Sequence, residues 1–206
     1  STATAIWHKG HLFFLMNKSV KYGARVVYSD FNNPESFPPN NNFTVPPVGT
    51  FGVTGGLSTG DRLFLGTAGE MFSLTGAVQQ TFRLRRVSSQ YGLGGVRGGA
   101  VVAPDQAVAF ATEMSSPAGA TAEYPQPRQI IAISGDEVVP IGDRVLTYIR
   151  TGSDARYDTG AQNWTALKGV LFMPDRAEAA SAKRVLFFSP KTGGFWPWTM
   201  ASSVGI

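Results

Sequence analysis

Residues 60–76, GDRLFLGTAGEMFSLTG, contain the clearest hairpin signal in the sequence. Two short apolar runs, 62–65 and 70–74, are joined through Thr67, Ala68 and Gly69. Glycine readily adopts the positive φ that a tight turn requires, so we expect a turn of this kind at Gly69. Two short strands cannot bury their faces alone, and this hairpin therefore needs neighbouring sheets.

Similar pairs of apolar runs recur along the chain. Residues 10–15 pair with 25–29, residues 100–112 form a turn at Pro104-Asp105 and pair with 129–134, and 169–173 pair with 184–189. The later strand of each pair ends in a serine, at Ser29, Ser73, Ser134 and Ser189, giving spacings of 44, 61 and 55 residues. Without the 16 residues of 113–128, the middle spacing is 45. A period of this length with several short strands is typical of one blade of a β-propeller.

We therefore predict an all-β fold, a β-propeller that is small or incomplete, with blades of short antiparallel strands. Residues 1–206 are expected to form a single domain with long loops at 30–48 and 113–128. Four repeats are few for closure, so either a fifth sheet is assembled from the remaining strands or the missing blades lie outside this chain. A sandwich or jelly roll would use similar strands. Helical patterns are confined to 142–150 and 176–183.

The composition limits the classes of function. The net charge of +4 comes from 18 Lys and Arg against 14 Asp and Glu, without a run of five like charges, so nothing beyond a passive contact with DNA is supported. There is no cysteine, which excludes disulfides and thiolate metal sites. We expect no membrane anchor, because the chain has no apolar run long enough for a transmembrane helix.

The sequence predicts no enzyme, because no group of residues has the pattern of a catalytic site. Asp30, Glu35, Asp136 and Glu137 are the carboxylate candidates for a glycosidase, but each lies in a turn context, and no G-x-S-x-G motif is present. We predict no catalytic residues and no cofactor. The Gly-rich run 91–99 lacks the Lys-Ser/Thr of a P-loop and is interpreted as a bulge or close backbone packing.

His8 and His11 flank Gly10, and a bend there would let both side chains face a metal. Because no Asp, Glu or Cys nearby completes a coordination shell, we favour a structural role and predict no metal site.

Two groups of side chains have open interpretations. Arg83, Arg85, Arg86 and Arg97 form a basic strand face near Tyr91; nucleic acid would suit them, but we favour a wet face or an ion-pair surface between subunits. The aromatic group Phe195, Trp196 and Trp198 either closes the last sheet of the core or stacks on sugars.

Several phrases of the sequence occur in a familiar order. They are ARVVYSDFNNPESFPPNNNFTV (24–45), GDRLFLGTAGEMFSLTG (60–76), RRVSSQYGLGG (85–95) and RVLFFSPKTGGFWPWTM (184–200). In this order, over nearly the whole chain, they resemble the β-propeller structural proteins of tailed-phage virions, of the tail hub or nozzle class. Members of that class are usually longer.

The resemblance implies a structural component of the virion tail or head-to-tail complex, made in the host cytoplasm. It implies partners that are copies of the chain in a ring and other tail or portal-adapter proteins, around the DNA channel. We expect the long loops to form the contacts, through the residues Asn32, Asn33, Pro34, Phe37, Asn41, Phe43 and Tyr124. Alternatives are a host-surface glycan-binding module using Trp196 and Trp198, and a propeller glycosidase using Asp136 or Glu137.

Overall fold

A computed structural model describes residues 3–16, 25–46, 52–93, 99–113, 129–146, 160–164, 168–173 and 182–201. The elements of these residues are strands and two short 3-10 helices, η1 (Gln79–Thr81) and η2 (Asp143–Val145). The predicted all-β class is therefore confirmed. Arg97, Tyr124 and the predicted loop over 114–128 lie outside the described residues, as do 147–150 and 176–181 of the predicted helices.

The first half of the chain forms two four-stranded antiparallel sheets, each with its strands in sequence order. The first sheet contains β1 (Ala3–His8), β2 (His11–Met16), β3 (Arg25–Tyr28) and β4 (Asn42–Thr44). The second contains β5 (Gly55–Ser58), β6 (Leu63–Gly66), β7 (Met71–Thr75) and β8 (Arg83–Ser88). The hairpin predicted within 60–76 is thus the central pair, β6 and β7, of the second sheet.

The second half repeats this order. The third sheet contains β10 (Gly99–Ala103), β11 (Gln106–Glu113), β12 (Gln129–Ser134) and β13 (Glu137–Pro140), and the short β9 (Tyr91–Leu93) also pairs with β11. The fourth contains β14 (Gly160–Trp164), β15 (Gly169–Met173), β16 (Ala182–Ser189) and β17 (Gly194–Ala201). The four repeating serines all lie in the third strand of a sheet or directly after it. The predicted repeat is therefore one sheet.

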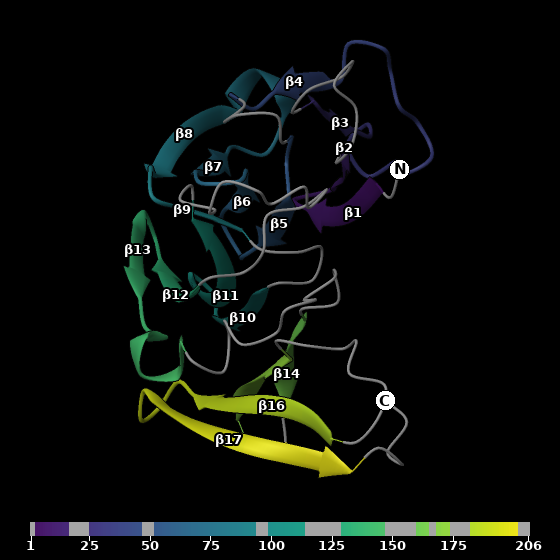
Figure 1. Cartoon of the computed structure of the whole chain (residues 1–206). Helices are drawn as coiled ribbons and strands as arrows, with labels where there is room; N and C mark the ends of the chain where they lie inside the picture. Colours follow the sequence, from purple (N-terminus) through teal and green to yellow (C-terminus); the bar gives the residue numbers. More distant parts are fainter. Residues whose placement is uncertain are drawn as a thin grey trace.

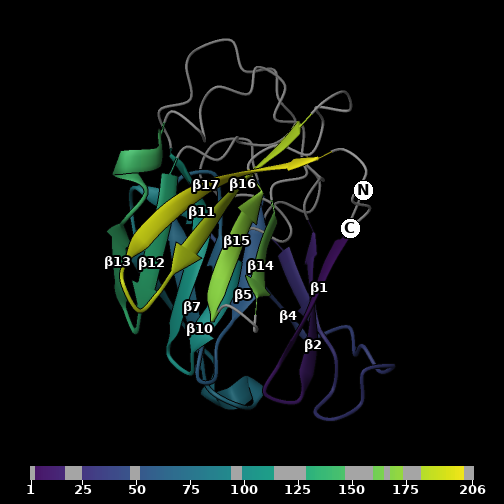
Figure 2. The same cartoon turned by 90° about the horizontal axis from the view of Figure 1, so that it is seen from below.

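The four sheets follow one another around an arc, which gives the molecule the curl of half a barrel (Figure 1). The first strands of consecutive sheets, β1, β5, β10 and β14, adjoin one another on the inner side, and β8, β13 and β17 lie on the outer side. Figure 2 shows the same order from below, with the fourth sheet in front. The described strands form this open arc and not a closed ring, and they contain no fifth sheet.

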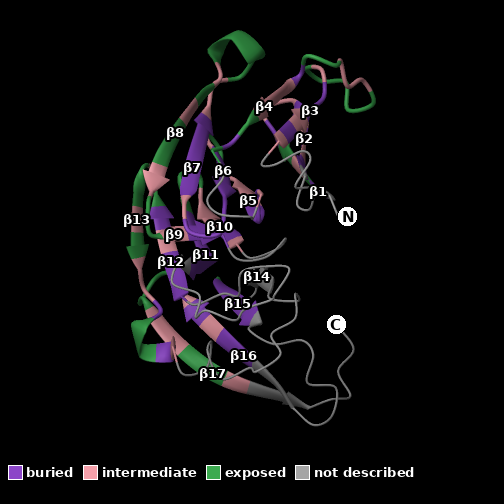
Figure 3. Ribbon diagram, turned by 45° about the horizontal axis from the view of Figure 1, so that its top comes forward, coloured by how far each residue is buried: buried purple, intermediate pink, exposed green. Residues whose placement is uncertain are grey.

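Apolar side chains fill each space between neighbouring sheets. Phe13 and Leu65 belong to the cluster between the first two sheets, Phe64 and Ile131 to the next, and Phe110 to the last. Figure 3 shows the consequence: the second and third strands of the inner sheets are largely buried, and the outer strands β8 and β13 are largely exposed. Sheets two and three are thus buried on both faces, which explains why their central strands are continuous apolar runs.

Three local predictions are corrected by the structure. The predicted loop at 30–48 contains a strand, β4, because Asn42, Phe43 and Thr44 pair with β3. Gly69 is absent from the positive-φ glycines; the backbone amide of Thr67 donates to the Glu70 carbonyl instead, over 2.8 Å. The end of the helix predicted at 176–183 is also wrong, since β16 begins at Ala182.

The Gly-rich segment after β8 forms a close backbone contact. A Cβ atom on Gly92 would lie 1.7 Å from the carbonyl oxygen of Thr67, and one on Gly66 would lie 2.3 Å from the Leu93 amide nitrogen. A hydrogen bond also holds β9 on the second sheet: the Thr54 hydroxyl donates to the Leu93 carbonyl over 2.7 Å. The interpretation of this run as close packing is therefore confirmed for Gly92.

Candidate interaction surfaces

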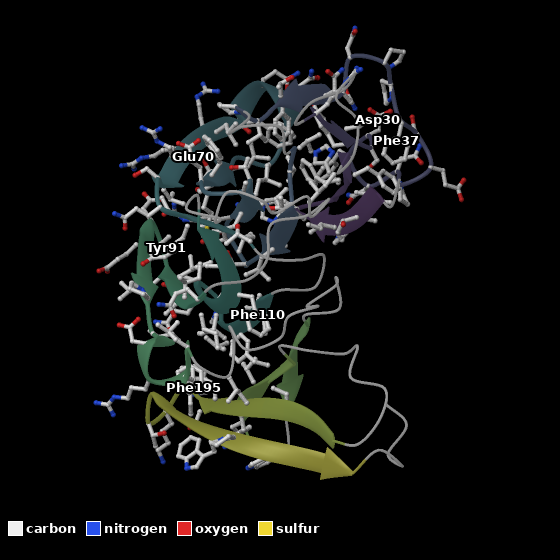
Figure 4. All side chains as sticks on the ribbon, viewed as in Figure 1. Asp30, Phe37, Glu70, Tyr91, Phe110 and Phe195 are labelled. Atoms are coloured by element: carbon white, nitrogen blue, oxygen red, sulfur yellow. The ribbon has the colours of Figure 1, made fainter. Side chains whose placement is uncertain are left out.

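The loop between β3 and β4 is organised around the carboxylate of Asp30. Its Oδ2 accepts a hydrogen bond from the Ser36 hydroxyl over 2.7 Å, and its Oδ1 accepts one from the Asn41 side-chain amide over 3.1 Å. The Asp30 backbone amide also donates to the Ser36 carbonyl over 2.8 Å. Figure 4 shows Asp30 and Phe37 in this loop, beyond the edge of the first sheet. The carboxylate therefore closes the loop upon itself and gives it a defined shape.

The predicted contact residues of this loop fall into two groups. Asn32, Asn33 and Pro34 are exposed at its tip, where Asn32 has a φ of 55° and its backbone amide donates to the Gly10 carbonyl over 2.6 Å. The other three pack within the chain. Asn41 is buried against Asp30, Phe37 lies against Phe14, with ring centroids 5.2 Å apart, and Phe43 packs on the first core cluster.

The basic strand face carries its own counter-charges. On β8, Arg85 donates to Asp136 over 2.9 Å and Arg86 donates to Glu70 over 2.9 Å. Arg62 bonds the second oxygen of Asp136. Figure 4 places Glu70 beside this outer strand. Since Asp136 belongs to the third sheet and β8 to the second, this face is an ion-pair surface between sheets of one chain.

Arg83, the third described arginine of the basic strand face, bonds to backbone carbonyls close to it in the sequence. Arg83 is exposed, and its guanidinium donates to the backbone carbonyls of Gln80, over 3.3 Å, and Phe82, over 3.0 Å. These bonds hold the side chain over η1, at the start of β8. Of the three described arginines of this face, none is therefore left without an acceptor in the fold.

His8 and His11 face each other across the β1–β2 hairpin, and both are buried. Nδ1 of His8 lies 2.8 Å from the Ser58 hydroxyl. In His11, Nδ1 lies 2.7 Å from the Ser29 carbonyl and Nε2 lies 3.1 Å from the Ala77 carbonyl. Four aromatic rings surround His11, those of Phe13, Tyr28, Phe31 and Phe82. The two histidines thus join the first sheet to the second.

Burial lowers the pKa of His8 from 6.5 to about 4, because the imidazolium would lose its hydration inside the core. The positive charge of Lys9 and the neighbouring His11 lower this pKa further, and Asp61 opposes them. Nε2 of His8 is buried and has no hydrogen-bond partner. Within the described residues, no group of three or more His, Cys, Asp or Glu is placed to hold a metal ion.

The aromatic residues of β17 divide between the two faces of the fourth sheet. Phe195 packs in the core on Phe188, with ring centroids 4.8 Å apart (Figure 4). Trp196 and Trp198 point to the opposite face, where Trp198 stacks on Phe187 at 5.3 Å with an interplanar angle of 7°. Trp196 is 43% exposed. The core interpretation therefore holds for Phe195, and the two tryptophans form an aromatic surface.

One apolar surface was missed by sequence reasoning. Trp7 is 51% exposed on β1, on the face of the first sheet that points away from the second, and it pairs with Leu12. Phe14 lies on the same face. The run HLFFLM at 11–16 contains the signal, because strands buried on one face alternate apolar and polar residues and this one does not.

No family model matches the chain, and no curated protein is significantly similar to it. Among the described residues, no helix is long and apolar enough to cross a membrane.

Proposed function

We propose that the chain is a structural subunit of a phage-type virion tail or head-to-tail complex and that its four sheets are blades of a β-propeller. In this role it acts by assembling with copies of itself and with neighbouring tail proteins around the DNA channel, and it catalyses no reaction. It is made in the host cytoplasm and resides in the virion.

One observation carries this proposal: four sheets with the same up-and-down strand order pack face to face in one arc, with their first strands inside. Propeller blades have this strand order and this placement of the first strand. The phage-like phrases at 24–45, 60–76 and 184–200 provide the second support, since each contains two adjacent strands, of the first, second and fourth sheets respectively.

The loop between β3 and β4 is the proposed contact element for neighbouring tail proteins. The Asp30 network holds the loop in shape before any partner binds, so the loop loses less conformational entropy on binding. Asn32, Asn33 and Pro34 then offer exposed polar and apolar groups at the tip. Any contact with DNA would be passive, because Arg85 and Arg86 are engaged by acidic side chains.

Immunogold labelling of virions tests the proposal. Antibody raised against the purified chain should decorate the tail or neck of particles from cells that carry the gene. The Asn33→Arg variant of the loop tip should fold normally and be incorporated less well. Particles that carry no label, or label confined to cell debris, would contradict the virion assignment.

A second candidate function is glycan recognition, which the exposed Trp196 beside the stacked Phe187 and Trp198 favours. Flat aromatic surfaces bind the apolar faces of sugars. A glycan array probed with the chain and with its Trp196→Ala variant tests this candidate. Signal that requires Trp196 would support it, and signal equal for both proteins would refute it.

A further inference from the structure

The two end sheets of the arc are built like sheets that are covered on both sides. In the inner sheets, the central strands carry apolar residues on both faces, and both faces are buried against neighbouring sheets. In β6, for example, Leu63 packs on one side and Phe64 on the other. The end sheets keep this pattern. A sheet with one face in water would carry polar residues on that face.

On the first sheet, the centre of the outward face is apolar, beside Arg25 and Asn42. Antiparallel pairing places Trp7 opposite Leu12, and Phe14 opposite Val27, so these four side chains share one face. Their inward neighbours Phe13 and Leu15 belong to the core. Trp7 is 51% exposed, and Leu12, Phe14 and Val27 are half-buried. Phe37 of the loop lies against Phe14 and extends this surface, which we call the leading face.

On the fourth sheet, the outward face is also apolar and richer in aromatic residues. Pairing places Leu171, Phe187 and Trp196 in one row across three strands, with Val185 and Trp198 in the next row. Trp196 is 43% exposed and Phe187 is half-buried, and Leu171 and Val185 are buried. We call this surface the trailing face.

We propose that the trailing face of one copy packs on the leading face of a second copy, and that two copies joined in this way at both ends form a closed ring of eight sheets. The occupant follows from the pattern inside the chain. Inside the chain, the apolar face of each sheet packs on the apolar face of the next one, so the leading and trailing faces are placed to form one more interface of this kind.

The curvature supports two copies. The four sheets have the curl of half a barrel, so a second copy, related to the first by a twofold axis, would supply the other half and close the ring. The joint is heterologous, because different surfaces meet, and it closes only if the curvature is maintained across it. This inference rests on the proposed role as an assembling subunit and adds which surfaces assemble and with what.

Light scattering after size exclusion, across a dilution series of the full chain, tests the inference. The wild type should have twice the mass of the 22.0 kDa chain. Trp7→Arg blocks the leading face and Trp196→Glu blocks the trailing face; each should raise the dissociation constant at least about tenfold, as expected for tryptophans at the centre of an interface. Val139→Arg, at a 42% exposed position of the outer strand β13, is the matched control and should remain a dimer.

Mixing the two blocked variants gives the decisive result. One joint of the mixed pair then has two intact faces, so a dimer should reappear on mixing although each variant alone is monomeric. If only one of the two variants is impaired, the joint uses one face twice and the inference is wrong. Circular dichroism of each variant confirms that it folds.

Three other results would overturn the inference. A wild type that is monomeric at all concentrations has no such joint, and open chains of increasing mass would exclude closure by two copies. A monomer whose tryptophan fluorescence responds to oligosaccharides would assign the trailing face to sugars. Absence of the dimer with virion labelling intact would remove this inference and leave the proposed function standing.

Discussion

Arg85 of the second sheet and Asp136 of the third are joined by a hydrogen-bonded ion pair of 2.9 Å. Asp136 lies in the turn between β12 and β13, and its other oxygen is bound by Arg62, from the β5–β6 connection. One carboxylate therefore holds two segments of the neighbouring sheet at the outer rim.

Replacing Asp136 by Asn should lower the free energy of unfolding by about 1 kcal/mol, since the lost pairs are partly exposed. Urea denaturation measures the effect, and the difference from wild type should shrink at high salt because salt screens surface charges. Glu137→Gln, at the exposed next residue, is the control and should change little. Equal stability of the two variants would show that the ion pairs do not hold the sheets.

Gly92→Ala should be among the most destabilising single substitutions. The added Cβ would lie 1.7 Å from the Thr67 carbonyl oxygen, so β9 must move away from the second sheet. We expect a loss of about 3 kcal/mol, at the upper end of the range for overpacking. Gly135→Ala is a useful comparison, because Gly135 has a φ of 57° with no atom near the new Cβ. Its cost should be about 1 kcal/mol from backbone strain alone. Similar costs at both sites would contradict the close contact.

The free energy of unfolding should decrease as the pH is lowered through the range in which His8 binds a proton. The pKa of His8 is lowered to about 4 in the folded chain and is 6.5 in the unfolded chain, so the unfolded state binds more protons between these values. The contribution is complete above pH 6.5 and is lost as the pH falls toward 4. Its size is at most about 3 kcal/mol. Thermal unfolding from pH 7.5 to 4 measures it, and His8→Gln should flatten the profile over this range. An unchanged profile in the variant would exclude His8 as the cause.

Asp30→Asn should loosen the loop between β3 and β4. The neutral amide weakens the charge-assisted bonds from Ser36 and Asn41, each shorter than 3.2 Å in the wild type. We expect the backbone amides of Asn33 and Ser36 to exchange hydrogen about tenfold faster. Glu35→Gln removes the same charge from an exposed position of the loop and should leave exchange unchanged. Equal exchange in both variants would show that Asp30 does not organise the loop.

Sequence reasoning found the strands that carry apolar runs, and also β8, whose apolar and basic residues alternate; most of the other strands were missed. The second and third strands of every sheet, such as GVLFM of β15 and RVLFFS of β16, are buried on one or both faces and are therefore apolar. First strands such as β5 have small residues instead. A Cβ on Gly56 would lie 2.4 Å from a side-chain carbon of Ile6, because the first strands of neighbouring sheets crowd together inside the arc. Only small residues fit in such a crowded strand, and small residues do not form the apolar pattern by which a strand is recognised in the sequence.

The surfaces were less predictable than the fold. The loop at 30–48 was recognised from its Asn and Pro content, but which asparagine is structural depends on its distance from Asp30, and Asn41 is the buried one. The partners of Arg85 and Arg86 come from 51 and 16 residues away in the sequence, so no local pattern identifies them. Trp7 is exposed because its sheet lies at the end of the arc, a property of the whole assembly of sheets.

The uninterrupted strand order within each sheet has an evolutionary consequence. Apart from β9, which pairs with β11, each strand pairs with a sequence neighbour, and the contacts between sheets are mainly side-chain packing at their shared boundary. Duplication or deletion of one contiguous four-stranded unit would thus lengthen or shorten the array and leave the main ladders of the other sheets intact. The same locality suits synthesis on the ribosome, since each unit can complete its pairing before the following one emerges.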